Sequence, residues 1–366
     1  MIKVTLTNEI LRYITEIEQN RYKVSSVKLS KTVMNKLRKN SKKKSSYASN
    51  KIEGNPLSEK QVDEVIESDG RKHYLKPEQE VRNYFLALNY LEEKVSKKEK
   101  LSMKLILDVQ KLVEKGASKE KIGLRGPMPP GVLFAVYDSK TGNPDYIPPE
   151  YCDIPGLLNE LVEYVNTTDD HPLIVAAVVH YQLVTIHPFE DGNGRTARLL
   201  SGYIMDLNGY GFNGIGSLEE YFAYDIDEYY ESIQMGLPAL YYSGRANPPH
   251  PEIWINYFLR MVKLYSNKVC DLQLASEEED IAGSLSFLKG KEKELLQFLI
   301  KNYKGEFTPI EVSRKLSVTN KTIINRLMVL VKNGFVIPIL VNKRIRFYEL
   351  SEFTRDHEKE IMKAIG

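Results

Sequence analysis

The sequence predicts a mainly α-helical protein with two small β-hairpins. Through most of the chain, apolar residues recur three or four positions apart, which is the spacing of one helix face. The exceptions are β-branched and aromatic runs at 132–137, 335–340 and 344–350, each close to turn-forming residues. A hydrophobic content of 42% and a charged content of 27% are typical of a globular protein.

The length of 366 residues is enough for about two or three domains with cores of their own. We predict an N-terminal helical region over residues 1–100, a core over 101–275, a linker over 276–284 and a C-terminal module over 285–366. The linker is placed at the acidic run Glu277–Asp280, which is followed by Ile-Ala-Gly-Ser.

Charge and cysteine content narrow the class of protein. A net charge of +2 does not by itself indicate binding to nucleic acid. Cys152 and Cys270 are far apart, which argues against a disulfide framework and fits a reducing compartment. No apolar run is long enough to span a bilayer, and the first residues lack the apolar centre of a signal peptide. We therefore expect a cytoplasmic protein with no membrane partner.

Elements in the N-terminal half follow from apolar spacing and capping residues. Ile10, Ile14 and Ile17 predict a first helix. The basic run at 36–44 is interpreted as a solvated helix face or a connector rather than a nucleic-acid site. Further helices, the first capped by Ser58, are predicted over residues 58–70, 77–95, 101–114 and about 155–166.

A small β-hairpin is predicted within this mainly helical region. Residues 132–137 have the composition of a strand, and a turn at 141–144 leads to Tyr146 and Ile147. The residues alone leave open whether this hairpin only covers the helical core or takes part in function.

The most informative stretch is HPFEDGNGRTAR, residues 187–198. The apolar runs on either side of it, 173–186 and 197–207, predict two helices packed in a core. The motif is therefore expected to form a tight loop between two buried helices.

The side chains of this loop suit a phosphate-handling active site. The Gly192-Asn193-Gly194 turn would leave backbone N–H groups free to bind an anion at the positive end of the second helix. Arg195 and Arg198 lie on one helical face, where both could bind phosphates. Asp191 is an oxygen ligand suited to Mg²⁺, and His187 is the candidate general base.

These residues resemble the signature HPFx(D/E)GNGRxxR of the Fic family and match it at every specified position. The resemblance covers roughly residues 45–245 and implies an all-helical Fic core with a small β-hairpin flap. It implies transfer of AMP from ATP to a Tyr, Thr or Ser hydroxyl of a protein target, which can be the protein itself. The other interpretation, a purely structural loop, would not need two arginines, an aspartate and Gly-Asn-Gly together.

By position, the resemblance gives each residue of the motif a role. His187 would deprotonate the target hydroxyl as it attacks the α-phosphorus, and Asp191 would hold Mg²⁺. The Gly192-Asn193-Gly194 turn and Arg195 would cradle the α- and β-phosphates, and Arg198 would hold the γ-phosphate. Positioning and charge neutralisation would then do most of the catalytic work.

Ser49 and Glu53 form a second motif. They lie four positions apart on one face of a helix, at about 45–55, that Gly54 ends. This segment resembles the inhibitory helix (S/T)xxxE(G/N) that some family members carry. The resemblance implies that Glu53 pairs with Arg198 and occupies the place of the γ-phosphate, so we predict an autoinhibited enzyme.

Two further assignments follow from the resemblance. The predicted hairpin resembles the flap by which family members register an extended target segment through main-chain hydrogen bonds. Its candidate docking residues are Val132, Leu133, Phe134 and Ala135. Tyr230, in a helix predicted over 225–235, is a candidate ATP contact.

The C-terminal module is predicted to contain three helices and a hairpin in the order of a winged helix-turn-helix. The helices are expected at 291–303, 308–316 and 320–332, and the strands at 335–340 and 344–350. The third helix and the hairpin tip present residues suited to phosphates and base edges: Thr319, Asn320, Lys321, Thr322, Asn325, Arg326, Lys343, Arg344 and Arg346. DNA binding and protein docking are both open for this module.

The leading prediction is an AMP transferase that uses ATP and Mg²⁺ on a protein target and is restrained by Glu53. The first alternative is removal of AMP from a modified protein, with Glu53 orienting a water in the same pocket. The second is a DNA-binding regulator whose Fic domain senses nucleotide; a homodimer is a further candidate assembly. A family branch that transfers phosphate departs from the signature at Gly-Asn-Gly-Arg, so Gly194 argues against it.

Overall fold

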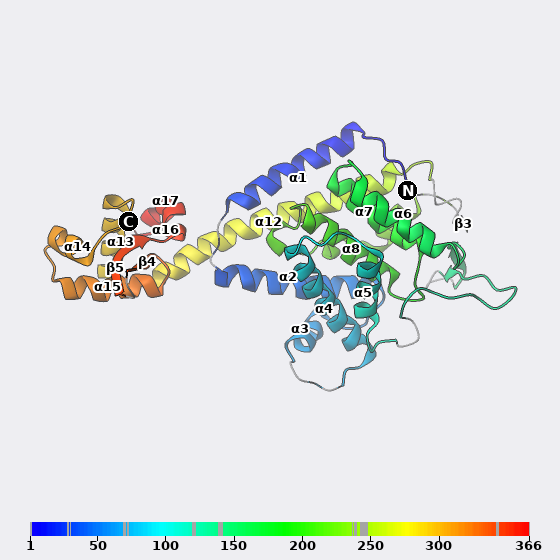
Figure 1. The fold of residues 1–366 in the computed structure, drawn as a ribbon, viewed down its shortest axis with the longest axis horizontal. Coiled ribbons are helices and arrows are strands. Elements are labelled where there is room, and N and C mark those ends of the chain that lie inside the picture. The colour runs from blue at the N-terminus through cyan, green and yellow to red at the C-terminus, as the bar shows by residue number, and fades with distance from the viewer. Residues whose placement is uncertain are drawn as a thin grey trace. The chain divides into compact units, whose positions relative to one another are not determined.

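The structure is a computed structural model, and it confirms the predicted mainly α-helical fold (Figure 1). It describes residues 2–27, 29, 31–68, 71, 73–118, 122–137, 142–235, 237, 240–241, 248–341 and 344–365. The chain forms two compact units. The first contains Met1–Val24 and Lys36–Val269, and the second contains Ser25–Asn35 and Cys270–Gly366.

The first unit is built almost entirely from helices. These are most of α1 (Asn8–Ser26) and of α2 (Lys31–Ile52), then α3 (Glu59–Glu67), α4 (Lys76–Ser96), α5 (Met103–Glu114), α6 (Ile154–Thr167), α7 (Pro172–Ile186), α8 (Asn193–Leu207), α9 (Glu219–Phe222), α10 (Ile226–Gln234) and the first part of α12 (Glu252–Ser286). Each helix predicted in this part of the chain is present, and Ser58 caps α3 as expected. In the described residues, no helix has the length and apolar character needed to cross a bilayer.

Helices α7 and α8 pack against each other at the centre of this unit (Figure 1). Every side chain of α7 from Leu173 to Leu183 is buried, and a helix that is apolar all round is stable only inside a core. Trp254 of α12 donates its Nε1–H to the carbonyl oxygen of Ala177 at 2.8 Å. Helix α8 is also largely buried, although it carries Arg195 and Arg198, so it brings two positive charges into the interior.

Helix α2 carries the predicted basic run and leads to the second motif. Lys42, Lys43 and Lys44 form ion pairs with Glu92 of α4, Glu67 of α3 and Glu220 of α9, so this run fastens α2 to three neighbouring helices. The helix ends at Ile52, and Gly54 follows with a φ of +80°, a conformation that favours glycine.

The hairpin is shorter than predicted. Strand β1 (Val136–Tyr137) pairs antiparallel with β2 (Pro144–Ile147), and β2 pairs in parallel with β3 (Leu240–Tyr241). The prediction of a strand over residues 132–135 was wrong. Because Val136 lies opposite Tyr146, Ala135 would lie opposite Ile147, and residues 132–134 would lie opposite a segment that begins at Pro148-Pro149, two residues with no N–H to donate.

Residues 276–284, which were predicted to be a polar linker, lie inside the 35-residue helix α12. Ile281, Leu285 and Leu288 recur at helical spacing and are buried in the core of the second unit. The acidic run therefore belongs to a helix with one apolar face. His357 of the same unit lies 2.7 Å, through Nε2, from Glu277 Oε1.

The second unit contains the predicted helices and hairpin in the predicted order, followed by two short helices that were not predicted. Its elements are α13 (Gly290–Asn302), α14 (Pro309–Leu316), α15 (Asn320–Lys332), β4 (Val336–Val341), β5 (Arg344–Leu350), α16 (Glu352–Asp356) and α17 (Glu358–Ile365). Thr308 and Glu311 form the predicted capping box. Residues 69–70, 141 and 342–343, which fall in a predicted helix end and in predicted turns, lie outside the described residues.

Candidate active site

His187 ends helix α7 and begins the motif. Its backbone has the left-handed φ of +48°, and its N–H donates to the carbonyl oxygen of Leu183 at 3.0 Å. Nδ1 lies 3.3 Å from the carbonyl oxygen of Val184. Since a carbonyl can only accept, this contact requires the proton on Nδ1 and leaves the lone pair on Nε2, as a general base needs.

The surroundings of His187 keep the imidazole neutral. Burial lowers its pKa from 6.5 to about 4, and the positive charge of Arg125 acts in the same direction against the opposing effect of the Val184 carbonyl. The side chain is therefore in its basic form throughout the neutral pH range.

Arg125 fixes the position of the His187 loop and was not singled out by the sequence. Its backbone N–H donates to the carbonyl oxygen of Pro188 at 2.9 Å, and its Nε donates to that of His187 at 2.9 Å. Its Nη2 donates to the carbonyl oxygen of Pro149, which follows β2. The guanidinium lies 4.7 Å from the centre of the Phe134 ring. One arginine thus links the His187 loop to the segment around the hairpin.

The candidate docking residues lie beside this arginine. The ring of Phe134 is 5.9 Å from the ring of His187, whereas Val132 and Leu133 are each 49% exposed and Ala135 is partly buried. Of the four residues, Phe134 is the one in ring contact with the candidate base.

Asn193 closes the turn between α7 and α8. Its Nδ2 donates to the carbonyl oxygen of Phe189 at 2.8 Å, and the Phe189 N–H donates to its Oδ1 at 3.0 Å. The side chain therefore shapes the loop from inside, and any contact that Asn193 makes with an anion would come from its backbone. Gly192 precedes α8 with a φ of +80° and provides no side-chain cap. The first N–H groups of a helix have no partners inside it, so those of α8 could bind an anion.

Arg195 is buried at the base of this turn. Its Nη2 lies 2.9 Å from Glu114 Oε1 of α5 and 3.2 Å from Asp191 Oδ1. Within the described residues, Arg195 Nε and Nη1 have no hydrogen-bond partner. A Cβ at Gly192 would lie 2.7 Å from Glu114 Oε1, so glycine is required there for this carboxylate to approach. The buried donors of Arg195 are well suited to a phosphate oxygen.

Arg198 is held by the end of α2. Its Nε donates to Ser49 Oγ at 2.8 Å, and its Nη2 donates both to the Ser49 carbonyl oxygen at 3.0 Å and to Glu53 Oε1 at 2.6 Å. Its Nη1 donates to the hydroxyl of Tyr229 at 3.3 Å. Burial alone would lower the pKa of Arg198, but the adjacent Glu53 carboxylate outweighs it and raises the pKa above its ordinary value. Ser49 and Glu53 thus take up most of the donors of Arg198.

The Glu53 carboxylate also lies against the start of α8. A Cβ at Gly194 would be 2.4 Å from Glu53 Oε1 and 3.1 Å from Arg198 Nη1. The first turn of a helix attracts anions through its free N–H groups and its dipole. Glu53 is therefore an internal anion placed on the anion-binding end of α8.

Tyr229 and Tyr230 of α10 border this site. Tyr229 is buried, and its hydroxyl also lies 2.8 Å from Nε2 of the buried His180. Tyr230 is 43% exposed, and its hydroxyl lies 3.5 Å from the carbonyl oxygen of Ile52. Burial and the Glu53 charge both raise the pKa of Tyr230, so its hydroxyl stays protonated. Tyr230 is thus next to the end of α2, and His180 belongs to the core.

The helical core thus holds a neutral imidazole, two buried arginines and a helix N-terminus within one twelve-residue stretch. Residues 46–205 match the Fic/DOC family, and this part of the chain is a Fic domain, as the signature predicted. The matched segment includes both motifs, from before Ser49 to beyond Arg198.

The curated relatives of this chain carry the name of the same family. The chain is 27% identical over 206 residues to protein adenylyltransferase Fic of Drosophila grimshawi, covering 54% of this chain and 40% of that protein. It is 29% identical over 202 residues to the protein of the same name in Aedes aegypti, covering 53% and 38%. The chain therefore spans about two fifths of the length of the curated relatives it matches.

Solved structures have the same fold. A Fic family protein from Desulfovibrio desulfuricans matches with a TM-score of 0.59 at 20% identity, over 96% of this chain and 98% of that chain. Fic-1 from C. elegans matches with a TM-score of 0.56 at 24% identity, over 73% and 72%.

Proposed function

We propose that this chain transfers AMP from ATP to a hydroxyl group of a protein and that Glu53 restrains the reaction. The observation that carries the proposal is the placement of His187 Nε2, with its lone pair free, at the end of a loop whose other end is an anion-binding helix start. The names of the curated relatives, protein adenylyltransferase Fic, agree with this chemistry.

The reaction needs little covalent chemistry from the protein. His187 Nε2 takes the proton of a Tyr, Thr or Ser hydroxyl while that oxygen forms a bond to the α-phosphorus of ATP. The bond from the α-phosphorus to the bridging oxygen breaks, and pyrophosphate leaves with the electron pair. The Gly192–Gly194 backbone and the free donors of Arg195 hold the α- and β-phosphates, and Arg198 holds the γ-phosphate.

Asp191 fits a magnesium ion that arrives with the nucleotide. The described residues contain no group of three or more His, Cys, Asp or Glu that could hold a metal by itself. Mg²⁺ is usually bound through one or two carboxylates together with substrate phosphates, and Asp191 is a partly exposed carboxylate beside the start of α8. When bound there, Mg²⁺ would neutralise phosphate charge.

Glu53 restrains the reaction by taking the place of the γ-phosphate. Its carboxylate is 2.6 Å from Arg198 Nη2 and lies over Gly194. A nucleotide that needs Arg198 must displace this carboxylate, because one guanidinium edge cannot bind both anions at once. Phe134 and its neighbours in the hairpin segment would register the target, and Tyr230 would border the nucleotide.

Mass spectrometry of the reaction products tests the kind of reaction. The Glu53→Gly protein is incubated with ATP and Mg²⁺, and tryptic peptides of the protein and of added lysate are sequenced. AMP on a Ser, Thr or Tyr hydroxyl supports the proposal. A phosphate adduct in its place contradicts AMP transfer, and loss of AMP from a previously modified peptide would instead support AMP removal.

The lowered pKa of His187 predicts a flat pH dependence. Because its pKa is about 4, the imidazole is already neutral, and active as a base, at pH 5 and above. We expect kcat/KM for ATP in the Glu53→Gly protein to change less than about threefold between about pH 5 and pH 8. Removing Glu53 acts in the same direction, since its charge raises the pKa of His187. A tenfold loss per pH unit below about 6.5 would show an ordinary, solvated imidazole.

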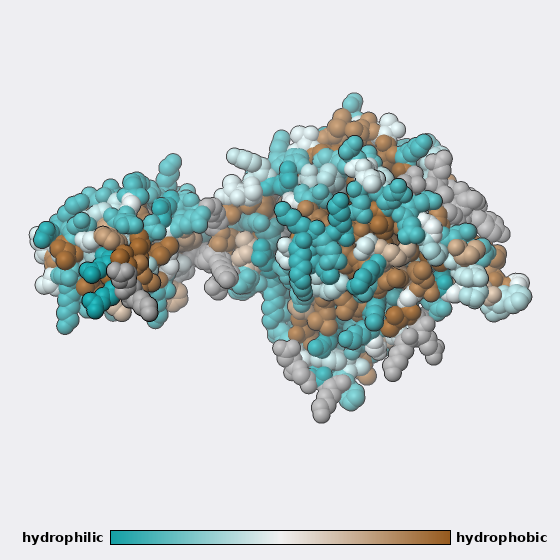
Figure 2. All heavy atoms as spheres, in the orientation of Figure 1, coloured by the Kyte–Doolittle hydropathy of each residue, from teal (hydrophilic) through white to brown (hydrophobic). Residues whose placement is uncertain are grey.

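DNA binding by the second unit is a second candidate function, supported by its charge. Residues 308–350 carry eight Lys or Arg against two Asp or Glu, a net charge of +6. Asn320, Lys321 and Asn325 of α15 are exposed, as is Arg344 at the start of β5. Figure 2 also shows apolar residues among the hydrophilic ones on this unit, and Leu340 and Ile345 of the hairpin are more than half exposed. Those residues favour the rival role of protein docking.

A salt titration separates the two roles. We expect the full chain to bind a mixed-sequence duplex, with an affinity that falls steeply as salt rises from about 50 to 200 mM. Lys321→Ala and Arg344→Ala should each weaken binding and reduce the salt slope by about one, and Lys359→Ala on α17 should not. Absence of duplex binding, or binding that all three variants retain, would favour protein docking.

A further inference from the structure

Helix α2 presents a regular row of polar side chains to the core. Ser41, Ser45 and Ser49 are spaced four residues apart and therefore share one face of the helix, and Glu53 follows its last residue at the same spacing. We call these four residues the inhibitory face of α2. Ser49 and Glu53 contact Arg198, as described above, and the two other members contact a different part of the chain.

Ser41 and Ser45 are held by residues 216–219. The N–H of Gly216 donates to Ser41 Oγ at 2.6 Å, and Ser45 Oγ donates to Glu219 Oε2 at 2.8 Å. Glu219 itself is 8% exposed, so its carboxylate lies inside the protein. Residues 216–219 thus hold α2 at Ser45 and Ser41, about one and two helical turns before Ser49.

The Glu219 carboxylate accepts hydrogen bonds from two further hydroxyl groups. Ser217 Oγ donates to Oε2 at 3.1 Å, and Tyr84 of α4 donates to Oε1 at 2.9 Å. Burial, followed by the Glu219 charge, raises the pKa of Tyr84 well above its usual value, which keeps the phenol protonated as a donor. A buried carboxylate with several donors is held firmly, since each hydrogen bond to a charged group is strong.

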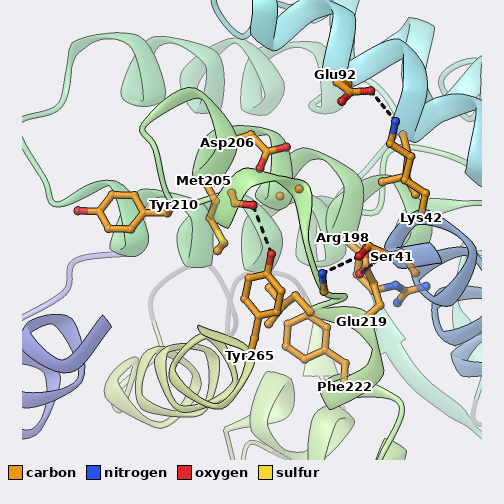
Figure 3. Close-up of a pocket in the computed structure, with 17 residues that line it drawn as sticks. Ser41, Lys42, Glu92, Arg198, Met205, Asp206, Tyr210, Glu219, Phe222 and Tyr265 are labelled. Atoms are coloured by element: carbon orange, nitrogen blue, oxygen red, sulfur yellow. Dashed lines mark hydrogen bonds and ion pairs between the residues drawn. The ribbon is translucent and has the colours of Figure 1, made fainter. Parts of the chain in front are cut away.

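The same contacts border a cavity of about 130 Å³, lined by Ser41, Ser45, Arg198, Glu219 and residues of α8 and α12 (Figure 3). Gly214 and Gly216, which precede Glu219, have φ values of +71° and +86°. The segment that holds α2 is therefore a glycine-containing turn that borders this cavity on one side and packs closely on the other, since a Cβ at Gly216 would lie 2.8 Å from the Tyr265 ring.

We propose that Glu219 is a positioning residue that holds the inhibitory face of α2 through Ser45 and so presents Glu53 to Arg198. This inference rests on the proposed function, since it assigns the restraint by Glu53 to a second, buried carboxylate. Within the described residues, the Glu219 carboxylate accepts hydrogen bonds from Ser45, Ser217 and Tyr84. Loss of its contact to Ser45 frees the end of α2, which lets Glu53 leave Arg198 and opens the site to the γ-phosphate.

Hydrogen–deuterium exchange of the full chain tests the positioning role without relying on activity. Ser45→Ala removes the contact to Glu219, and we expect amide exchange over residues 45–54 to rise about fivefold or more. Alanine has a higher helix propensity than serine, so faster exchange would oppose the intrinsic effect of the substitution. Ser217→Ala is the comparison variant: it removes a donor to the same carboxylate and the acceptor of the Glu220 N–H, and in the described residues its hydroxyl makes no hydrogen bond to α2. Unchanged exchange in Ser45→Ala would overturn the inference.

Activity provides the second readout. Labelling by ATP that carries a radioactive α-phosphate should rise in Ser45→Ala, whereas Ser45→Ala should add nothing in a Glu53→Gly background. Lower labelling in both backgrounds would indicate ordinary structural damage and would contradict a positioning role. If exchange rises but Glu53→Gly itself shows no labelling, the contact to α2 stands and the proposed AMP transfer fails. If Glu53→Gly is active and Ser45→Ala exchanges faster without any gain in labelling, the restraint does not depend on Glu219.

Discussion

Replacing Glu53 with glycine is expected to raise the rate of AMP transfer by roughly 5- to 150-fold, the range of a coupling of about 1–3 kcal/mol. In the structure Oε1 of Glu53 lies 2.6 Å from Nη2 of Arg198, and the carboxylate covers the start of α8. Glycine removes this internal anion and leaves Arg198 and Gly194 available to phosphates. The gain should appear mainly as a lower KM for ATP, because the substitution removes a competitor for nucleotide binding.

A matched control separates this effect from a general loss of acidic charge. Glu64 of α3 is exposed and pairs only with Lys60, at 4.0 Å, among the ion pairs of the described residues. Glu64→Ala should label at the wild-type rate. Equal labelling by wild type and Glu53→Gly would remove the claim of autoinhibition, while activity in the wild type alone would mean that Glu53 takes part in the chemistry.

Replacing His187 with alanine should lower AMP transfer by about 10²- to 10⁴-fold, the usual contribution of a positioned general base. The measurement is made in the Glu53→Gly protein, where the uninhibited rate is large enough to show the loss. ATP binding should change little, because the anion site is formed by the start of α8, Arg195 and Arg198, and not by the imidazole. Titration with a fluorescent ATP analogue measures the binding.

His250 offers the control for this substitution. Its side chain is 66% exposed, and it pairs with Glu252 near the start of α12. His250→Ala should retain both labelling and nucleotide binding. A His187→Ala protein that labels within threefold of its parent would exclude His187 as the base, and one that no longer binds nucleotide would give the side chain a structural role.

The helices could be predicted because their signals are local. The spacing of Ile10 and Ile17, the Ser58 cap and the Gly54 stop each depend on residues within a few positions. The hairpin was overpredicted because a strand also needs a partner, and the partner of residues 132–134 would have begun with two prolines. The acidic run in α12 was predicted to be a linker because its charged residues drew attention away from the helical spacing of Ile281 and Leu285.

The site residues that could be predicted are likewise those that lie close together in the sequence. The loop from His187 to Arg198 is contiguous, so its residue types could be read together, and the motif around Glu53 could be recognised by resemblance. Glu114, Arg125, Tyr229 and Glu219 were missed because each reaches its partner through the packing of different elements. Arg195 and Glu114, for example, are 2.9 Å apart in space but belong to α8 and α5, and no spacing rule connects them.

Asn193 illustrates a different limit. The motif placed it among the residues that bind phosphate, and the structure directs its side chain to the backbone of Phe189, where it closes the turn. A role as a backbone donor to phosphate is compatible with this geometry. A side-chain contact would first have to break two hydrogen bonds inside a buried loop.

The most direct test of the central claim is transfer of a radioactive label from the α-phosphate of ATP, compared with a label on the γ-phosphate, by Glu53→Gly and by Glu53→Gly combined with His187→Ala. The account predicts protein-bound label from the α-position only, and its loss in the double variant. Label from the γ-position, or α-label that the double variant retains, would contradict AMP transfer at His187.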